Sequence, residues 1–336
     1  MIEDRYITLA HGNGGRHMRA LIERIFAHHL ANPALNVHLD AAPLVLDPDL
    51  HPFITTDGFT VQPLEFPGGD IGSLAVNGTV NDLAVAGAIP RFLTLNAIIE
   101  EGLEIVCLDR IVKSLADAAL TADVRVVAGD TKVVPRGQGG GLYFVTTGVG
   151  LRSPGCALGM ETIRDGDVVL VSGPVGDHGI AVMLAREDFE LSGSVQSDCA
   201  AVTPLTAPLA CLKGVRFMRD PTRGGLATVA HEIAAATSLD VRLVEDQVPV
   251  RDAVRSVCQM LGYDPYYLAC EGRVVAVVAP EVADVALNIW RNAGGGTDAA
   301  IVGRLCDGRA RVILETEIGG ERFLEELEDD PLPRIC

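Results

Sequence analysis

The most distinctive reactive group in this sequence is the thiol of Cys336, which is the last residue of the chain. It follows Pro-Leu-Pro-Arg-Ile, and the two prolines fix φ and favour an extended path. The segment from Asp330 onward spans roughly 20 Å when extended, which is long enough to carry a nucleophile end-on into a pocket. Free cysteines are also common as small buried apolar side chains. The sequence therefore leaves two interpretations open, a mobile reactive arm or a structural cysteine.

A glycine-rich segment near the start has the composition of an anion-binding loop. Three glycines in four positions let backbone amides turn towards an anion, as phosphate-binding loops do. The segment matches neither a P-loop nor a dinucleotide fingerprint, and an ordinary glycine turn before a helix explains the same residues. It consists of His11, Gly12, Asn13, Gly14 and Gly15.

Four aspartates stand where a divalent cation and phosphate groups could be held together. Asp57 follows a predicted strand, Asp82 lies beside Asn81 in a predicted helix, Asp130 ends another strand, and Asp220 precedes a helix. Hard cations such as Mg²⁺ take oxygen ligands and share them with phosphates. Each aspartate alone is more often a cap or turn residue. Their joint occurrence with the glycine-rich segment favours a site for Mg²⁺ and a nucleotide.

Four further side chains have chemistry that fits such a site. Lys132 could neutralise a phosphate or polarise a carbonyl oxygen, or it is simply solvated. Glu271 precedes an apolar run and could act as a general base if partly buried, or it is a charge at a strand edge. Arg223, at a predicted helix start, suits phosphate binding. His178 is interpreted as a structural or cap-region residue.

The elements that would position these residues alternate between β-rich and helical stretches, which predicts an α/β or α+β fold. Apolar residues at three- and four-residue steps predict a helix over 104–120, and further helices are expected over 71–88, after Gly179 and over 226–236. The loop near 151–155 predicts the domain boundary, and the acidic stretch 321–330 predicts a solvated helix or linker. Strands are expected at 53–56, 92–99, 124–128, 142–147, 168–171, 241–244, 274–278 and 300–303.

Composition narrows the class of protein. The net charge of −18 disfavours nucleic acid and anionic membranes as partners. No apolar run approaches the roughly 20 residues of a membrane span, and the acidic start lacks the regions of a signal peptide, so we expect a cytoplasmic protein. The eight cysteines include no C-x-x-C pair, which disfavours a zinc or redox motif. In the cytoplasm they are expected to be reduced.

Together these motifs resemble the HypE family of hydrogenase maturation factors, which are ATP-dependent carbamoyl dehydratases. The glycine-rich and acidic motifs are shared with aminoimidazole ribonucleotide synthetase, selenophosphate synthetase and thiamine-monophosphate kinase, whereas the terminal Pro-Arg-Ile-Cys is the specific signal. The resemblance extends over essentially the whole chain, and its segments are 11–15, 66–72, 78–91, 129–134, 172–179, 219–227 and 333–336.

The resemblance implies a homodimer of two-domain α/β chains of the aminoimidazole ribonucleotide synthetase type. The N-terminal sheets of two copies would join into a barrel-like core, with ATP in a cleft there. Residues 1–150 would form the ATP-binding, dimer-forming domain, residues 151–320 the second α/β domain, and residues 321–336 a mobile tail that carries the cysteine.

The implied reaction converts a carbamoyl group on Cys336 into a thiocyanate, which supplies cyanide ligands for NiFe-hydrogenases. The carbamoyl group would come from the carbamoyltransferase HypF, and the cyano group would pass to the HypC–HypD complex. Lys132 would bind the carbamoyl oxygen or the phosphate, and Glu271 would accept the nitrogen proton. The loop 11–15 would cover the phosphates of ATP, with Asn81 and Arg223 in the same binding site. The implied Mg²⁺ ligands are Asp57, Asp82, Asp130 and Asp220.

Two other functions remain open from the residues. One is a different enzyme of the superfamily, such as a selenophosphate synthetase, although that family places a cysteine or selenocysteine near the glycine-rich loop and here no cysteine precedes Cys107. The other is a non-catalytic partner whose tail docks into a hydrogenase assembly complex.

Overall fold

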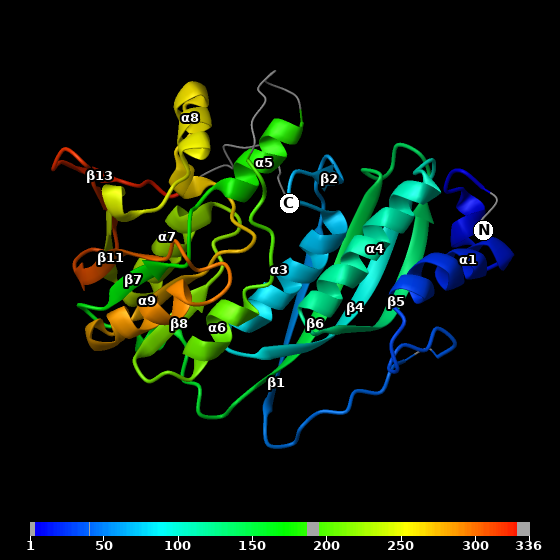
Figure 1. The fold of residues 1–336 in the computed structure, drawn as a ribbon, viewed down its shortest axis with the longest axis horizontal. Coiled ribbons are helices and arrows are strands. Elements are labelled where there is room, and N and C mark those ends of the chain that lie inside the picture. The colour runs from blue at the N-terminus through cyan, green and yellow to red at the C-terminus, as the bar shows by residue number, and fades with distance from the viewer. Residues whose placement is uncertain (1–3, 40, 187–194, 328–336) are drawn as a thin grey trace.

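A computed structural model describes residues 4–39, 41–186 and 195–327, which form two α/β domains (Figure 1). The N-terminal domain has a four-stranded sheet in the order β1-β6-β4-β5. The β4–β5 pair is parallel, and β6 pairs antiparallel with both β1 and β4. The strands are β1 (His51–Phe59), β4 (Ile89–Glu100), β5 (Arg125–Val134) and β6 (Leu142–Arg152).

Two helices, α3 (Ile71–Val85) and α4 (Ile105–Thr121), cover one face of this sheet (Figure 1). The predicted helix over 104–120 is confirmed, and its apolar stripe is buried from Ile105 to Ala119. In α3 almost every side chain is buried, because this helix lies between the sheet, α4 and the second domain. A Cβ on Gly72 would lie 2.4 Å from the carbonyl oxygen of Ile111, so only glycine allows α3 and α4 to approach this closely.

A short helical segment precedes the sheet and lies beside its β5 edge. It begins with η1 (Leu9–Gly12) and α1 (Arg16–Leu21) and continues through η2 (Ile22–Phe26) and α2 (Ala27–His29). A Cβ on Gly12 would lie 2.9 Å from that of Val133 in β5, so the glycine-rich segment rests directly on this strand. A small hairpin, β2 (Glu65–Phe66) and β3 (Gly69–Asp70), leads into α3.

The second domain has a seven-stranded sheet in the order β13-β12-β9-β11-β7-β10-β8. Side chains from α7 pack on one face, and side chains from α6 and α9 pack on the other. Its strands are β7 (Val168–Val171), β8 (Val215–Arg219), β9 (Leu239–Val244), β10 (Val275–Val278), β11 (Ala300–Asp307), β12 (Val312–Glu315) and β13 (Glu321–Phe323). Its helices are α5 (Asp177–Ala185), α6 (Thr203–Ala210), α7 (Gly225–Thr237), α8 (Asp252–Leu261) and α9 (Ala283–Arg291), joined by the short turns η3 (Met160–Thr162), η4 (Glu245–Gln247), η5 (Pro265–Tyr267) and η6 (Pro280–Val282).

Several predicted elements need correction. Asp57 and Asp130 lie inside β1 and β5 rather than at strand ends. The strand β5 continues through Gly129, where a Cβ would lie 2.4 Å from the carbonyl oxygen of Leu95 in β4. Five strands were not predicted, namely β2, β3, β8, β12 and β13. The helix α5 starts at Asp177, before Gly179. Residues 321–323 pair with β12 as a strand instead of forming a helix or linker.

The closed barrel implied by the resemblance is not present in this single chain, whose N-terminal sheet is open with β1 and β5 as its edges. The expectation of fully reduced cysteines is wrong for one pair. Cys156 and Cys211 form a disulfide between Cα atoms 4.5 Å apart. The two residues are 55 positions apart in sequence, so no local motif could have indicated the bond.

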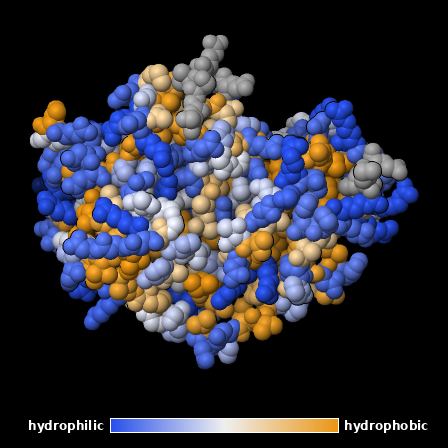
Figure 2. All heavy atoms as spheres, in the orientation of Figure 1, coloured by the Kyte–Doolittle hydropathy of each residue, from blue (hydrophilic) through white to orange (hydrophobic). Residues whose placement is uncertain are grey.

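The surface in Figure 2 is mostly hydrophilic, with apolar side chains gathered in patches along the lower side of this view. Within the described ranges, none of the helices has the length and apolar character needed to cross a bilayer. Exposed apolar side chains of the N-terminal domain include Val45 and Ile54, which are 89% and 73% exposed.

Candidate functional site

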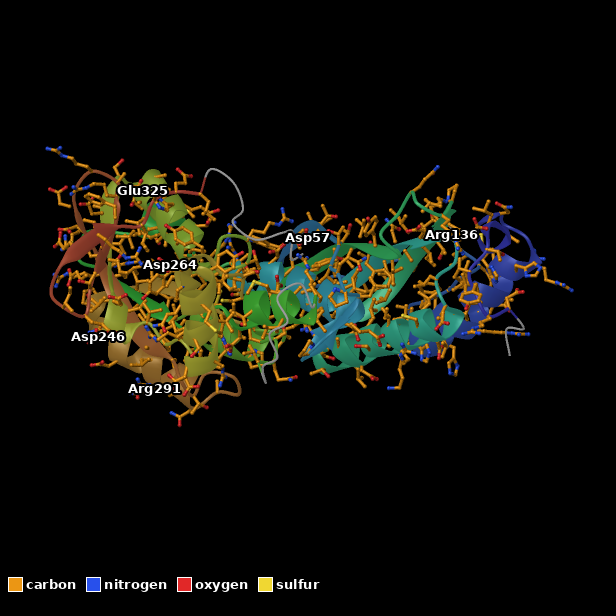
Figure 3. The ribbon with its side chains drawn as sticks, turned by 90° about the horizontal axis from the view of Figure 1, so that it is seen from above. Asp57, Arg136, Asp246, Asp264, Arg291 and Glu325 are labelled. Atoms are coloured by element: carbon orange, nitrogen blue, oxygen red, sulfur yellow. A yellow bond between two sulfur atoms is a disulfide. The ribbon has the colours of Figure 1, made fainter. Side chains whose placement is uncertain are left out.

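Three of the predicted carboxylates meet at the junction of the two domains. Asp57 projects from β1, Asp82 from α3, and Asp220 directly follows β8. The Thr55 hydroxyl donates a 2.9 Å hydrogen bond to Asp82. Arg223 approaches Asp57, with 3.8 Å between Nη2 and Oδ1. Figure 3 shows Asp57 near the middle of the elongated molecule, between the domains.

The pKa values of Asp82 and Asp220 are raised, as expected where carboxylates surround a cation site. Burial, followed by the negative charge of Asp82, raises the pKa of the Asp220 carboxyl to about 7. Burial also raises the pKa of Asp82, against the opposing effect of the Thr55 hydrogen bond. Crowded carboxyl groups whose ionised forms are disfavoured are relieved by a bound cation. The arrangement therefore fits Mg²⁺, which prefers oxygen ligands and keeps several waters.

Glu271 lies next to this cluster in the loop before β10. It is 3% exposed, and its Oε2 lies 4.0 Å from the position of a Cβ on Gly78 in α3. Burial, followed by repulsion from Asp220 and then Asp198, raises the pKa of the Glu271 carboxyl well above its usual range. A carboxylate in such surroundings is a stronger proton acceptor than one in water.

A buried ionic network that the sequence analysis missed holds the Glu271 loop in place. Asp198 accepts backbone hydrogen bonds of 3.0 Å from Glu271 and 3.3 Å from Gly272. Arg273 lies 3.4 Å from Asp198 and 3.5 Å from Asp177. A Cβ on Gly272 would lie 1.9 Å from the Asp198 carbonyl oxygen, so glycine is required at this contact. These residues come from segments far apart in sequence, and no local pattern indicates their meeting.

Asn81 has a structural role in this arrangement. Its amide nitrogen donates 3.0 Å hydrogen bonds to the carbonyl oxygens of Ala200 and Glu271. Its amide oxygen accepts a 2.8 Å bond from the Val202 N–H. The side chain is thus a clamp between α3 and the second domain, and its assignment to ATP binding stays a prediction.

A cleft of about 490 Å³ opens beside the acidic cluster. Asp82 and Asp220 lie in its wall together with apolar and aromatic side chains such as Phe53 and Phe217. The guanidinium of Arg152 sits over the Phe53 ring, 4.2 Å from its centroid. The cleft therefore combines carboxylates with a flat apolar and cationic surface at the domain junction.

Asp130 and Lys132 lie in a second cluster on β5. Their side chains form a 2.8 Å ion pair and are 52% and 65% exposed. The hydrogen bond from Lys132 lowers the pKa of the Asp130 carboxyl. The glycine-rich segment rests on the same strand at Val133. This second cluster therefore joins the predicted phosphate loop to the predicted lysine.

The two clusters lie at opposite edges of the N-terminal sheet. Across the sheet, Asp57 aligns with Thr146, then with Leu95 and finally with Gly129. Three strand spacings separate β1 from β5, or roughly 14 Å. Asp130 is one residue beyond Gly129, so it points to the other face of the sheet. Within one chain the structure does not bring Asp130 and Lys132 to the acidic cluster.

Figure 3 shows this separation from above. Arg136, which follows the end of β5, lies far from Asp57. His178 is fully buried, and its Nδ1 lies 2.8 Å from the Ser197 hydroxyl, in line with a structural residue. Cys336 lies outside the described residues.

Known proteins are similar to this chain over nearly its full length. The models of the AIR synthase related protein N-terminal and C-terminal domains match residues 38–152 and 164–315. The carbamoyl dehydratase HypE of Azotobacter vinelandii is 44% identical over 332 residues, which cover 98% of this chain and 97% of that protein.

Solved structures agree with these matches. A crystal structure of the hydrogenase maturation protein HypE in complex with ATP is 42% identical, with a TM-score of 0.92 over 98% of this chain and 99% of the other. A HypE–HypF complex gives 42% identity and a TM-score of 0.80, over 92% of this chain and 100% of the matched one.

Proposed function

Because this chain belongs to the HypE family of carbamoyl dehydratases, within the AIR synthase related proteins, we propose that it dehydrates a carbamoyl group carried on its own Cys336. The family membership predicted from the motifs is confirmed, and the chain is a dehydratase. The proposed step uses ATP and yields a thiocyanate on the sulfur, ADP and phosphate. The observation that carries the proposal is the buried Glu271 beside three carboxylates at the domain junction.

The chemistry explains why an ATP site and a proton acceptor are needed together. Oxygen cannot leave an amide-like carbon as oxide, whereas phosphate is a good leaving group. Transfer of the terminal phosphoryl group to the carbamoyl oxygen therefore precedes cleavage of the carbon–oxygen bond. A proton leaves the nitrogen as phosphate departs, so that the C≡N bond forms. Glu271 is the group that accepts this proton, because burial makes its carboxylate unusually basic.

The acidic cluster supplies the magnesium ligands in this proposal. Asp57, Asp82 and Asp220 would hold the ion, which would neutralise charge on the phosphates during transfer. The raised pKa values of Asp82 and Asp220 support this assignment. Arg223 is well placed beside Asp57 to contact the phosphate groups.

A second copy of the chain is needed to complete this site. Lys132, Asp130 and the loop 11–15 lie at the opposite edge of the sheet from the acidic cluster. A two-fold dimer would place these groups of one copy against the acidic cluster of the other, and each copy would provide both halves. The proposal thus assigns Lys132 of the second copy to the carbamoyl oxygen or the transferred phosphate.

Features of the N-terminal sheet support this dimer. Both edge strands, β1 and β5, have no further strand beside them among the described residues. The face opposite α3 and α4 presents apolar side chains such as Ile54, which is 73% exposed, and Phe92 and Val149, which are half-buried. Joining two such sheets into a barrel would cover the apolar face and remove the exposed edges.

We also propose HypF as the donor of the carbamoyl group and a HypC–HypD complex as the acceptor of the cyano group. The HypE–HypF structure supports the first of these, because a relative 42% identical to this chain forms that complex. The tail would deliver Cys336 to each partner in turn, and return it to the ATP site between the two encounters.

ATP consumption by the carbamoylated chain tests the proposal. The chain carbamoylated at Cys336 should consume one ATP per modified cysteine and then stop, whereas Cys336→Ser after the same treatment should consume none. The half-buried, free Cys306 provides a matched control, since Cys306→Ser should behave as the natural chain. Equal ATP consumption with and without the carbamoyl group would contradict the proposal.

A further inference from the structure

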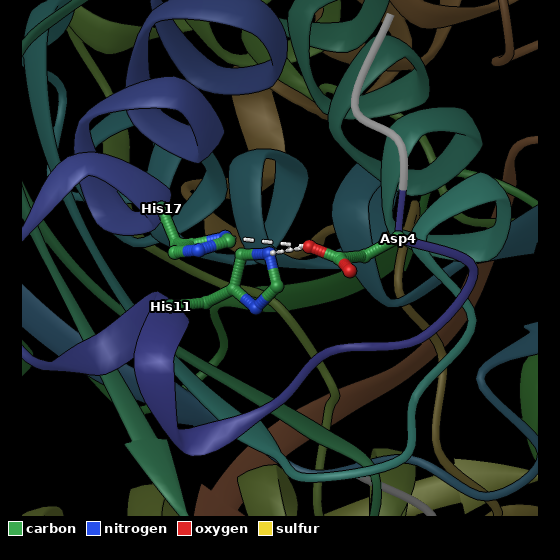
Figure 4. A group of neighbouring side chains, drawn as sticks. All are labelled: Asp4, His11 and His17. Atoms are coloured by element: carbon green, nitrogen blue, oxygen red, sulfur yellow. Dashed lines mark ion pairs between the residues drawn. The ribbon is translucent and has the colours of Figure 1, made fainter.

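Three side chains at the N-terminal end of the molecule form a compact group outside the acidic cluster. Asp4, His11 and His17 each direct one ligand atom to a common point, and these atoms all lie within 4.8 Å of one another (Figure 4). Asp4 Oδ2 is 3.5 Å from His11 Nε2 and 3.3 Å from His17 Nδ1. The residues come from the first described segment, from η1 and from α1.

We propose that Asp4, His11 and His17 bind a divalent transition-metal ion of the zinc class. Zinc bonds to nitrogen and carboxylate oxygen are about 2.0–2.2 Å long, which places neighbouring ligand atoms of a tetrahedral site roughly 3.3–3.5 Å apart. The two distances from Asp4 match that separation. Two imidazoles and one carboxylate suit zinc, cobalt, nickel or iron better than magnesium or calcium.

An unpartnered buried nitrogen independently indicates a ligand. His11 is 0% exposed, and its Nε2 has no hydrogen-bond partner among the described residues. The Asp4 carboxylate is the nearest acidic group but is too distant for a normal hydrogen bond. A buried polar atom without a partner is costly. A metal ion between these three residues would give it one.

The other ring nitrogen of His11 is held by Thr8. Nδ1 lies 3.0 Å from the Thr8 hydroxyl oxygen and 3.1 Å from the Thr8 backbone nitrogen. While the Thr8 N–H donates to Nδ1, the ring proton is on Nε2. Metal binding at Nε2 would move that proton to Nδ1, where the Thr8 hydroxyl oxygen can accept it, and the Thr8 N–H would give up its hydrogen bond to the ring. Such outer hydrogen bonds orient metal-bound histidines.

The ion would be reachable from solvent and would keep an open position. The side chains of Asp4 and His17 are 42% and 46% exposed, and three protein ligands leave a fourth tetrahedral position for water. The site would also tie the N-terminal segment and α1 to the start of the glycine-rich loop. It therefore holds this loop in place, whatever the loop itself binds, and does not depend on the proposed dehydration.

Cobalt(II) titration of the untagged, chelator-treated full chain tests the site. Cobalt should bind at one equivalent and give visible d–d absorption without a thiolate charge-transfer band. Asp4→Asn and His17→Ala should lose this absorption. The exposed His38 supplies the control, since His38→Ala should retain it. Thr8→Val should weaken affinity by about 10- to 100-fold. Zinc should displace the cobalt and raise the unfolding temperature of the natural chain but not of His17→Ala.

Each contrary result overturns the proposal. Absence of the cobalt absorption would show that the three side chains do not bind the ion. Absorption that persists in both Asp4→Asn and His17→Ala would place the ion elsewhere. A thiolate charge-transfer band would place it on a cysteine. His11→Ala is not needed for the test, because both exposed ligands can be changed without creating a cavity in the core.

Discussion

Replacing Asp220 by asparagine should stabilise the Mg²⁺-free protein at alkaline pH. Its carboxyl is 6% exposed, and burial together with the charge of Asp82 raises its pKa to about 7. Above that pH the folded chain must hold an ionised carboxylate in unfavourable surroundings. Asparagine has the same shape and no charge, so the substitution removes this destabilisation while retaining most of the packing.

The magnitude follows from the difference between the two pKa values. The ordinary value is 3.8 and the folded value is about 7, and each pKa unit corresponds to about 1.4 kcal/mol. The folded state therefore loses up to about 4 kcal/mol of stability above pH 7. Since the folded pKa is the higher one, the destabilisation fades as pH falls from 7 to 3.8. The advantage of Asp220→Asn should be about 4 kcal/mol at pH 8 and roughly half of that at pH 5.

Urea unfolding of both chains without Mg²⁺ or nucleotide, at pH 8 and pH 5, measures this difference. The exposed Asp246 lies far from the acidic cluster (Figure 3), and Asp246→Asn is the matched control that should change little at either pH. Adding Mg²⁺ and ATP should stabilise the natural chain more than Asp220→Asn. Equal stability of Asp220→Asn and the natural chain at pH 8 would refute the reasoning, as would an advantage that does not depend on pH.

Three further outcomes test the site and its assembly from two copies. Lys132→Ala should lower the rate of ATP-dependent dehydration by about 100-fold or more, measured as phosphate release, whereas Lys113→Ala on the exposed face of α4 should leave it unchanged. A one-to-one mixture of Lys132→Ala and Asp82→Asn, refolded together, should recover about a quarter of the natural rate, because half of the dimers then contain one intact site; no recovery would show that each site lies within one chain. Glu271→Gln should retain ATP binding, measured by calorimetry, yet lose at least about 100-fold in dehydration rate. In the natural chain that rate should rise with pH through the raised pKa of Glu271, since the ionised form accepts the proton, and a flat pH profile would contradict this role.

The sequence predicted secondary structure best where the spacing of apolar residues fits only one kind of element. The stripe from Ile105 to Ala119 predicted α4, since apolar residues at helical spacing have one buried face. The expected strand 124–128 was too short, since β5 continues through Gly129 to Val134, although glycine usually weakens a strand. Because Gly129 has no Cβ, β5 can approach the Leu95 carbonyl of β4 closely. Because β5 is continuous there, Asp130 and Lys132 lie on one face of the sheet.

The sequence predicted one site that contains all four aspartates, whereas within one chain Asp130 lies apart from the other three. Asp57, Asp82 and Asp220 come from two domains, and only the folded chain brings them together. Their separation from Lys132 depends on strand order, which the sequence pattern does not specify. The Asp198–Arg273 pair was missed for a similar reason, because its members are joined by tertiary packing alone. The disulfide between Cys156 and Cys211 likewise has no local signal.

Mass spectrometry of the C-terminal peptide tests the central claim most directly. The chain should first be incubated with HypF and its carbamoyl donor, and then with Mg²⁺ and ATP. The peptide that ends in Cys336 should gain the mass of one carbamoyl group on its sulfur and then lose one water only after ATP is added. Glu271→Gln should gain the carbamoyl group but retain the water. Loss of water without ATP, or an unmodified Cys336 throughout, would contradict the claim that the chain dehydrates its own terminal cysteine adduct.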